Sequence, residues 1–274
     1  MNATTAPQTR YLQLAGGTLA YDDTEGEGTP VVLLPGMLDS RAVYRHLRPL
    51  LTAAGHRVIT MDLRGFGESS IAWDDYGPAG AAADALALLD ELGIERAVLV
   101  GSSYTGASVV KAATTAPQKV AGIVLVDAFV ENLPQNALMR GLVQLTGSAV
   151  LAFPKVWGWY LNKMAYPGGV TPEIAAYNAR LEAALRTPGR KQATRGYVRG
   201  NSSPIGWTEG VECPALVLMG TKDPDFPKPE VVADRQVKAL NGRKVMIDGA
   251  GHYPMAQFPQ AVADALLPFL TEVS

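Results

Sequence analysis

A serine flanked by small residues is the strongest candidate for covalent chemistry in this chain. Residues 97–100 have the length and the branched side chains of a buried strand, and residues 107–116 predict a helix of small residues. The turn between them, Gly-Ser-Ser-Tyr-Thr-Gly at 101–106, puts Ser103 at the apex of a strand–turn–helix unit, where its hydroxyl would be exposed for attack. Ser102 would fit only in a shifted register, so Ser103 is the candidate nucleophile.

The same turn could instead cradle a phosphate at a helix N-terminus. A P-loop needs a Lys-Ser/Thr pair after its last glycine, and a dinucleotide fingerprint needs three glycines in G-x-G-x-x-G. Residues 101–106 match neither pattern. The choice therefore depends on whether the chain also supplies a base, an acid and an oxyanion hole.

Histidines are scarce, which narrows the search for the base that a serine nucleophile normally needs. The chain has three, at positions 46, 56 and 252. His252 lies in an Asp-Gly-Ala-Gly-His-Tyr-Pro loop between a predicted strand at 244–247 and the last predicted helix at 260–270. It is the candidate general base.

Three aspartates compete for the role of the triad acid. Asp223 and Asp225 follow the predicted strand at 215–219, and Asp127 follows the predicted strand at 123–126. The proline between the first two separates their orientations, so we expect only one of them to reach the histidine. The Gly-x-x-Asp spacing favours Asp223, while Asp225 is interpreted as a solvated turn residue.

An oxyanion hole is predicted from two backbone amides. Pro35-Gly36-Met37 follows a predicted strand at 31–34, and Gly36 would let the chain turn so that the Met37 N–H faces the reaction centre. The second donor would be the N–H of Tyr104, directly after the nucleophile. An ordinary strand-ending turn is the alternative interpretation of this segment.

Strands and helices alternate along most of the chain, which predicts the α/β class: a mostly parallel sheet with helices on both faces. The expected elements are a hairpin at 11–21, further strands at 31–34, 57–61, 97–100, 123–126, 215–219 and 244–247, and helices at 42–54, 80–92, 107–116 and 260–270. Sites in such sheets lie outside the carboxyl ends of the strands. Each candidate catalytic residue follows a strand.

The alternation stops between two strands, which predicts a helical cap at 130–207 inserted into a core formed by 1–129 and 208–274. Helix-like stretches are expected at Leu138–Phe153, Val156–Met164 and Glu173–Leu185. Four aromatic residues of the cap are candidates to line an apolar substrate pocket: Phe153, Trp157, Trp159 and Tyr160. The alternative is that they form the cap's own core.

The composition of the chain indicates which binding partners and which cellular location to expect. The chain has 274 residues, 47% of them hydrophobic and 18% charged, and its net charge of −2 offers no basic footprint for nucleic acid. No apolar run reaches the ~18 residues of a membrane span, and the N-terminus lacks the features of a signal peptide. The single cysteine, Cys213, excludes an internal disulfide and a thiolate zinc site. We therefore expect a cytoplasmic protein without a metal, and the oligomeric state stays open.

Taken together, these motifs resemble the α/β-hydrolase family, in its capped esterase and lipase-like group, over residues 26–269. The order Ser103, Asp223, His252 along the chain is that of this family. The matching segments are Asp-Leu-Arg-Gly-Phe-Gly-Glu-Ser at 62–69, Gly-x-x-Asp at 220–223 and Gly-x-Gly-His at 249–252. In that family the first of these segments is mostly structural.

The sequence departs from the family pattern at two positions. Pro35 stands where many members have histidine before the oxyanion glycine, and Thr105 replaces a glycine of the nucleophile turn. Both departures weaken assignment to a subfamily. Ser103 excludes the aspartate nucleophile that the resemblance associates with epoxide hydrolases and haloalkane dehalogenases.

The resemblance and the residues together predict a serine carboxylic-ester hydrolase that needs no cofactor and acts on small to medium, largely apolar esters. A lactonase, thioesterase, C–C hydrolase or acyltransferase could use the same triad. From a different class, a small-molecule receptor could retain the triad and signal through its cap.

Overall fold

A single eight-stranded sheet organises the computed structural model, which describes residues 8–130, 153–200 and 207–274. The strand order is β1-β2-β4-β3-β5-β6-β7-β8. The strands are β1 (Arg10–Leu14), β2 (Gly17–Asp23), β3 (Val31–Leu34), β4 (Val58–Met61), β5 (Ala97–Ser102), β6 (Val120–Val126), β7 (Ala215–Gly220) and β8 (Arg243–Ile247). The first two strands pair as an antiparallel hairpin and β2 runs antiparallel to β4, whereas every pair from β4 to β8 is parallel. The predicted mostly parallel sheet is confirmed.

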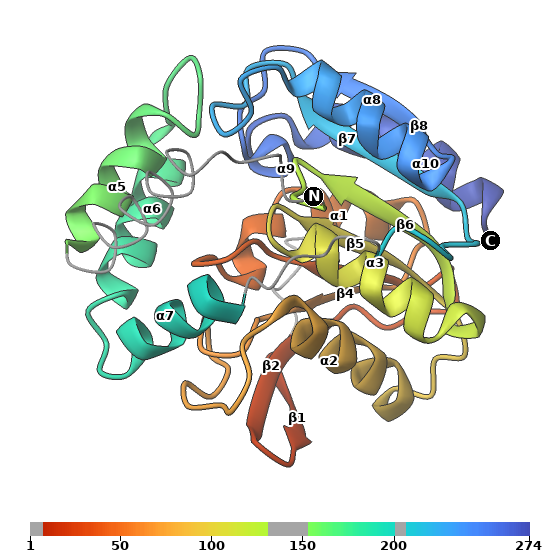
Figure 1. The fold of residues 1–274 in the computed structure, drawn as a ribbon, viewed down its shortest axis with the longest axis horizontal. Helices are drawn as coiled ribbons and strands as arrows, with labels where there is room; N and C mark the ends of the chain where they lie inside the picture. Colours follow the sequence, from red (N-terminus) through yellow and green to blue (C-terminus); the bar gives the residue numbers. More distant parts are fainter. Residues whose placement is uncertain (1–7, 131–152, 201–206) are drawn as a thin grey trace.

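Helices cover both faces because the inner strands are apolar on both sides. On β3, Val31 and Leu33 pack against α1 (Leu47–Ala53) and α10 (Pro259–Glu272). Val32 and Leu34 face the opposite layer of α2 (Pro78–Glu91), α3 (Thr105–Thr115) and α8 (Pro229–Leu240). Figure 1 shows α2 and α3 together on the same side of the sheet. The result is a three-layer α/β structure whose parallel strands end at one common edge.

Between β6 and β7, the described residues form three helices that stand beside this edge, on the left of Figure 1. They are α5 (Pro154–Lys163), α6 (Pro172–Ala184) and α7 (Arg190–Gly200), here called the α5–α7 segment. The helices expected at 156–164 and 173–185 correspond to α5 and α6. The stretch expected at 138–153 falls almost wholly outside the described residues, and the division into a core and a cap stays a prediction.

One predicted helix is divided in the structure. The sequence suggested a helix over 42–54, but a 3₁₀ turn, η1 (Arg41–Tyr44), precedes α1. Pro49 gives the reason, because it has no N–H to donate to the carbonyl four residues before it, and it is tolerated only in the first turn of a helix. The helix therefore begins at Leu47.

Two of the longer described helices were not expected from the sequence. The helix α7 is strongly polar, and its buried residues include the polar Thr194 beside Ala193 and Tyr197, so few apolar residues mark its inner face. The helix α8 follows the proline-rich turn at 224–229, which obscures where it begins. Short elements also occur as η2 (Pro117–Lys119) and α9 (Pro254–Gln257).

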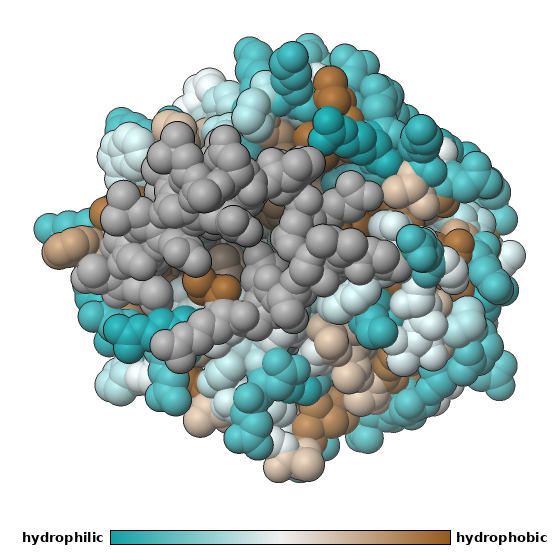
Figure 2. Space-filling view, in the orientation of Figure 1, coloured by the Kyte–Doolittle hydropathy of each residue, from teal (hydrophilic) through white to brown (hydrophobic). Residues whose placement is uncertain are grey.

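On the visible face, hydrophilic residues gather along the rim and hydrophobic ones lie between them in small groups (Figure 2). Within the described parts of the chain, none of the helices combines the length and the apolar character that a membrane crossing requires.

Candidate active site

Ser103 occupies a sharp turn between β5 and α3. Its backbone is left-handed, with φ of 53°, which is strained for a residue with a side chain. The strain is held by hydrogen bonds on both sides of the turn, from the Ser103 N–H to the Val126 carbonyl at 2.9 Å and from the Phe129 N–H to the Ser103 carbonyl at 3.0 Å. A strained, half-buried serine between a strand and a helix is the geometry of a nucleophile elbow.

Small residues make this turn possible. A Cβ on Gly101 would stand 2.3 Å from the Thr105 carbonyl oxygen, and one on Gly106 would stand 2.3 Å from the Ala128 Cβ. Both positions therefore need glycine for β5, α3 and the end of β6 to pack closely. Gly106 stands one position after the place where the family pattern has its second glycine.

Thr105 replaces the usual glycine of the turn without harm to its geometry. Its hydroxyl donates to the carbonyls of Leu34 at 3.0 Å and Ser102 at 2.9 Å. The side chain is fully buried, so these bonds satisfy a group that would otherwise be costly. The threonine ties the turn to the end of β3.

The three predicted catalytic side chains meet at the carboxyl edge of the sheet. Ser103 Oγ is 2.9 Å from His252 Nε2, and His252 Nδ1 is 2.8 Å from Asp223 Oδ2. A carboxylate only accepts hydrogen bonds, so Nδ1 carries the proton and Nε2 is free to accept from the serine hydroxyl. This is the tautomer that a general base needs.

Backbone contacts fix the loops that carry the base and the acid. The His252 N–H donates to the Ala165 carbonyl, just after α5, at 3.0 Å. A Cβ on Gly220 would stand 2.5 Å from the carbonyl oxygens of Ala250 and Gly251, so the acid loop and the histidine loop pack backbone to backbone. This close approach explains the glycine of Gly-x-x-Asp. In Gly-x-Gly-His, Gly249 has a left-handed φ of 72°, and a Cβ on Gly251 would stand 2.3 Å from the Ala165 carbonyl oxygen.

The charges around His252 favour its protonated form. Burial alone lowers the pKa of the imidazole, but the carboxylates of Asp223 and Asp225 outweigh it and raise that pKa above its ordinary value. Burial opposes ionisation of Asp223, yet the imidazolium and its hydrogen bonds hold the pKa of that carboxyl below the usual range. The site thus stabilises the imidazolium that forms when the serine is deprotonated.

Asp127 lies behind the acid and does not touch the base. Its Oδ1 accepts from the Gly220 N–H at 2.8 Å. Complete burial, and then the charge of the neighbouring Asp223, raise the pKa of Asp127 well above its ordinary value and so favour its neutral form. Of the three candidates, Asp223 is the one that faces His252 Nδ1, the position of the predicted acid.

The expectation that only one of Asp223 and Asp225 reaches the histidine is wrong. Asp225 Oδ2 lies 3.5 Å from His252 Nε2, on the side opposite Asp223. The intervening proline does separate the two orientations, but it sends them to the two different nitrogens of one ring. Asp225 also accepts from the Tyr160 hydroxyl at 2.8 Å, so it is not a solvated turn residue.

The predicted oxyanion loop lies against the nucleophile. A Cβ on Gly36 would stand 3.1 Å from the Ser103 Cβ and 3.6 Å from its Oγ. Within residues 8–130, 153–200 and 207–274, neither the Met37 nor the Tyr104 N–H has an acceptor. Unpaired amides beside a nucleophile are what an oxyanion hole requires, and the assignment of these two donors stays a prediction.

The four predicted pocket aromatics divide into two pairs. Phe153 and Trp159 are 65% and 57% exposed. Trp157 and Tyr160 turn inward and stack with ring centroids 5.1 Å apart. The structure therefore brings Trp157 and Tyr160 to the catalytic edge and leaves the other two at the surface.

Two contacts from the α5–α7 segment to the site were missed by the sequence reasoning. The Tyr177 hydroxyl on α6 donates to Asp39, two residues after Met37. Tyr197 on α7 packs edge-on against Tyr104, with centroids 5.2 Å apart. Neither tyrosine stands in a motif, so only the separate helical periodicity of α6 and α7 could have indicated their buried faces.

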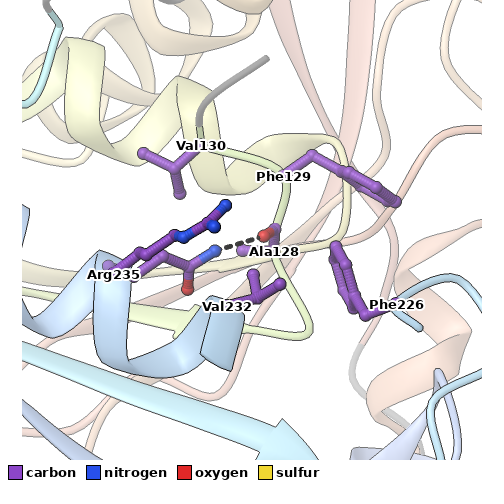
Figure 3. A pocket seen from close by; sticks show the side chains of 7 residues that line it. Ala128, Phe129, Val130, Phe226, Val232 and Arg235 are labelled. Carbon is purple, nitrogen blue, oxygen red and sulfur yellow. Dashed lines mark hydrogen bonds between the residues drawn. The ribbon is translucent and has the colours of Figure 1, made fainter. Parts of the chain in front are cut away.

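A small hollow opens beside the site between α8 and the loop after β6 (Figure 3). Phe129 and Phe226 lie ring to ring at one end, with centroids 4.7 Å apart, and Arg235 lies at the other. Gln236 donates to the Ala128 carbonyl at 2.6 Å. The same two phenylalanines stand near the His252 ring, at 6.1 and 6.5 Å between centroids.

Asp223, Asp225 and His252 each offer a ligand atom within 4.8 Å of the others, as a cation site would. However, Nδ1 of the histidine is bonded to Asp223 and Nε2 to Ser103. A metal at either nitrogen would displace a triad contact, so the cluster is better explained by the triad itself.

Comparison with known proteins agrees with this geometry. The model of the "Alpha/beta hydrolase family" matches residues 31–265. The chain belongs to this family. As an α/β-hydrolase it is 28% identical to epoxide hydrolase A of Mycobacterium tuberculosis, over 97% of this chain and 98% of that one. It is 29% identical to the dihydrolipoyllysine-residue acetyltransferase component of the acetoin cleaving system of Pseudomonas putida, over 96% and 70%.

Solved structures show the same fold. The crystal structure of bromoperoxidase from Bacillus anthracis is 25% identical, with a TM-score of 0.83, and covers 96% of this chain and 100% of that one. Since these α/β-hydrolases are named for different reactions, the fold alone does not choose the chemistry.

Proposed function

We propose that this α/β-hydrolase is a serine hydrolase that cleaves carboxylic esters through an acyl-enzyme. The observation that carries the proposal is the continuous chain of contacts from Ser103 through His252 to Asp223, at 2.9 and 2.8 Å. A relative's name does not decide the reaction, whereas the chemistry of the nucleophile does. A serine activated in this way attacks a carbonyl carbon.

In the proposed acylation step, Ser103 Oγ forms a bond to the ester carbonyl carbon while His252 Nε2 takes the serine proton. The negative charge on the carbonyl oxygen is held by the N–H groups of Met37 and Tyr104. The C–O bond then breaks, and His252 returns the proton to the departing alcohol. Asp223 keeps the imidazole oriented throughout.

Deacylation repeats these steps with water as the nucleophile. His252 takes a proton from water, the hydroxide attacks the acyl carbon, and the proton returns to Ser103 as the acid leaves. Each step uses only groups of this chain, the ester and water, so we propose that no cofactor takes part. Transfer to an alcohol instead of water would use the same groups.

A panel of chromogenic esters of increasing acyl length, run beside lactones and thioesters, tests the proposal. We expect the esters to turn over and Ser103→Ala to lower kcat by about six orders of magnitude with an unchanged fold by circular dichroism. A fluorophosphonate should label Ser103 once, and Ser102→Ala, the matched control, should label normally. Rapid thioester or lactone turnover with inert esters would reassign the substrate, and no turnover of any of them would favour a receptor.

A further inference from the structure

Asp225 places a second carboxylate on the reactive side of the catalytic histidine. Its Oδ2 is 3.5 Å from His252 Nε2, the nitrogen that also contacts Ser103 Oγ at 2.9 Å. Asp223, by contrast, contacts Nδ1 at 2.8 Å on the far side of the ring. The triad mechanism uses only one of these two carboxylates, so the position of Asp225 needs another explanation.

The side chain is held firmly in this position. The Tyr160 hydroxyl of α5 donates to Oδ1 at 2.8 Å, which leaves Oδ2 turned to the histidine. The Asp225 N–H donates to Asp223 Oδ1 at 2.8 Å, which fixes the backbone between the two carboxylates. The side chain is 28% exposed, so it is accessible without being freely solvated.

Among the described residues, no lysine or arginine forms an ion pair with the carboxylate of Asp225. Its partner in that part of the chain is His252. The histidine is neutral for part of each catalytic cycle, since it must accept the serine proton. During that part the carboxylate is available to a charge on the substrate.

Aromatic rings lie on both sides of Asp225 along its contacts and its chain. Tyr160, which donates to Asp225, stacks on Trp157 with the ring planes 16° apart. Phe226, the next residue, packs on Phe129 (Figure 3). Both phenylalanine rings also stand near His252. Ring faces beside a carboxylate form the kind of surface that recognises an ammonium group, and their low polarity strengthens its attraction to the carboxylate.

The departing alcohol must come close to this surface. Its oxygen receives the proton from His252 Nε2 and so must lie within hydrogen-bond distance of that nitrogen. A charge carried two or three bonds farther along the alcohol would therefore lie within a few ångströms of Asp225 Oδ2.

We propose that Asp225, held by Tyr160, is a specificity-determining residue that makes the enzyme prefer esters of alcohols carrying an ammonium group and reject those carrying a carboxylate. This inference rests on the proposed ester hydrolysis and adds the charge class of the leaving group. It also accounts for the bond between Tyr160 and Asp225, which orients the carboxylate toward the reaction centre.

Three acetate esters of similar shape test the proposal: acetylcholine as the cation, 3,3-dimethylbutyl acetate as its neutral analogue and 3-acetoxypropionate as the anion. The readout is kcat/KM for each ester, followed by acid release, and the test is the ratio of the charged ester to the neutral one. For the native enzyme we expect the cation to be favoured over the neutral ester, and the anion disfavoured, by about tenfold or more each.

Asp225→Asn keeps the shape of the side chain and removes its charge, so both ratios should move toward one by about tenfold. Asp264→Asn is the matched control, because Asp264 is exposed on α10 and the substitution changes the net charge equally. Its ratios should equal those of the native enzyme. Tyr160→Phe, which keeps the charge and loses the bond, should give ratios between those of the native enzyme and of Asp225→Asn.

Two results would overturn the inference alone: native ratios near one, or ratios in Asp225→Asn that match the native values while all three rates change together. In either case, the ester hydrolase proposal would still hold if the native enzyme hydrolyses the neutral ester and Ser103→Ala does not. If the native enzyme hydrolyses none of the three esters or the chromogenic panel, the proposed function fails and the charge preference fails with it.

Discussion

At the scale of single residues, the site depends on two buried aspartates in different protonation states. Asp223 accepts from His252 and the imidazole holds its pKa low, whereas burial and the charge of Asp223 raise the pKa of Asp127 and favour its neutral form. The two pKa values shift in opposite directions. The imidazole lowers the pKa of Asp223, whereas the hydrogen bond from the Gly220 N–H is too weak to offset the effect of full burial on the pKa of Asp127. Like-charged carboxylates in contact cannot both ionise cheaply.

This difference predicts opposite outcomes for the same isosteric change. Asp223→Asn should lower kcat by about four orders of magnitude, because the amide favours the wrong tautomer of the histidine. Asp127→Asn should stay within about tenfold of the native enzyme, because the amide is neutral like the carboxyl it replaces and can still accept from the Gly220 N–H. Initial rates on one activated ester, at matched folded fractions, make the comparison.

Asp127→Ala provides the control, since it removes the acceptor of the Gly220 N–H and should cost more activity than Asp127→Asn. A collapse of activity in Asp127→Asn beside a nearly normal Asp223→Asn would move the catalytic acid to the end of β6.

At the scale of elements, α5 meets the site with one face only. Trp157 and Tyr160 are three residues apart and share the inward face, as helical spacing requires. Trp157 also packs against the cluster that contains Met37 and Tyr104, the two predicted oxyanion donors. Trp159 lies on the opposite, exposed face.

The two tryptophans should therefore respond differently to truncation. We expect Trp157→Ala to reduce kcat/KM for long or bulky esters by about tenfold or more, while a small acetate ester is affected less. Trp159→Ala, a matched loss of the same side chain from the same helix, should leave the acyl-length profile unchanged. The measurement is the ratio of kcat/KM values across the chromogenic panel.

Equal profiles in the two variants would show that Trp157 does not line the pocket. A lowered melting temperature for Trp157→Ala with an unchanged profile would assign that residue to packing alone.

At the scale of the whole molecule, folding is coupled to the protonation of Asp39. Its carboxyl is fully buried, and burial raises its pKa to about 7 despite the hydrogen bond from Tyr177. A carboxyl whose pKa is higher in the folded state stabilises that state at low pH. Asp39 therefore makes its full contribution to the free energy of unfolding below the pKa of an unfolded aspartate, about 4. That contribution is lost as the pH rises through the folded-state pKa of about 7.

Asp39→Asn should remove this dependence, since the amide is neutral at every pH and can still accept from Tyr177. We expect the two proteins to melt at similar temperatures near about pH 4, and the variant to melt several degrees higher near about pH 8. Thermal unfolding across this range, with Asp264→Asn as the control, measures the difference. A constant difference at all pH values would show that Asp39 does not titrate in this range.

The fold, and the meeting of Ser103, His252 and Asp223, could be predicted from the sequence because local patterns mark both. Buried strands of a parallel sheet are short apolar runs, and Gly101, Gly220 and Gly251 stand where a side chain would collide with a neighbouring backbone. Each of these glycines stands within three residues of Ser103, Asp223 or His252, so it leaves a readable spacing in the sequence even where the backbone that it packs against is distant. The predicted cytoplasmic location and the core–cap division stay predictions.

Only the tertiary structure decided which side of the histidine each aspartate occupies. Asp223 and Asp225 are two residues apart, and no local pattern states that they face different nitrogens of a ring 29 residues away from the first. The same holds for Tyr160, which reaches Asp225 from a helix 65 residues earlier. These contacts arise when separate elements pack, and their energies depend on burial and distance, which a sequence spacing does not contain.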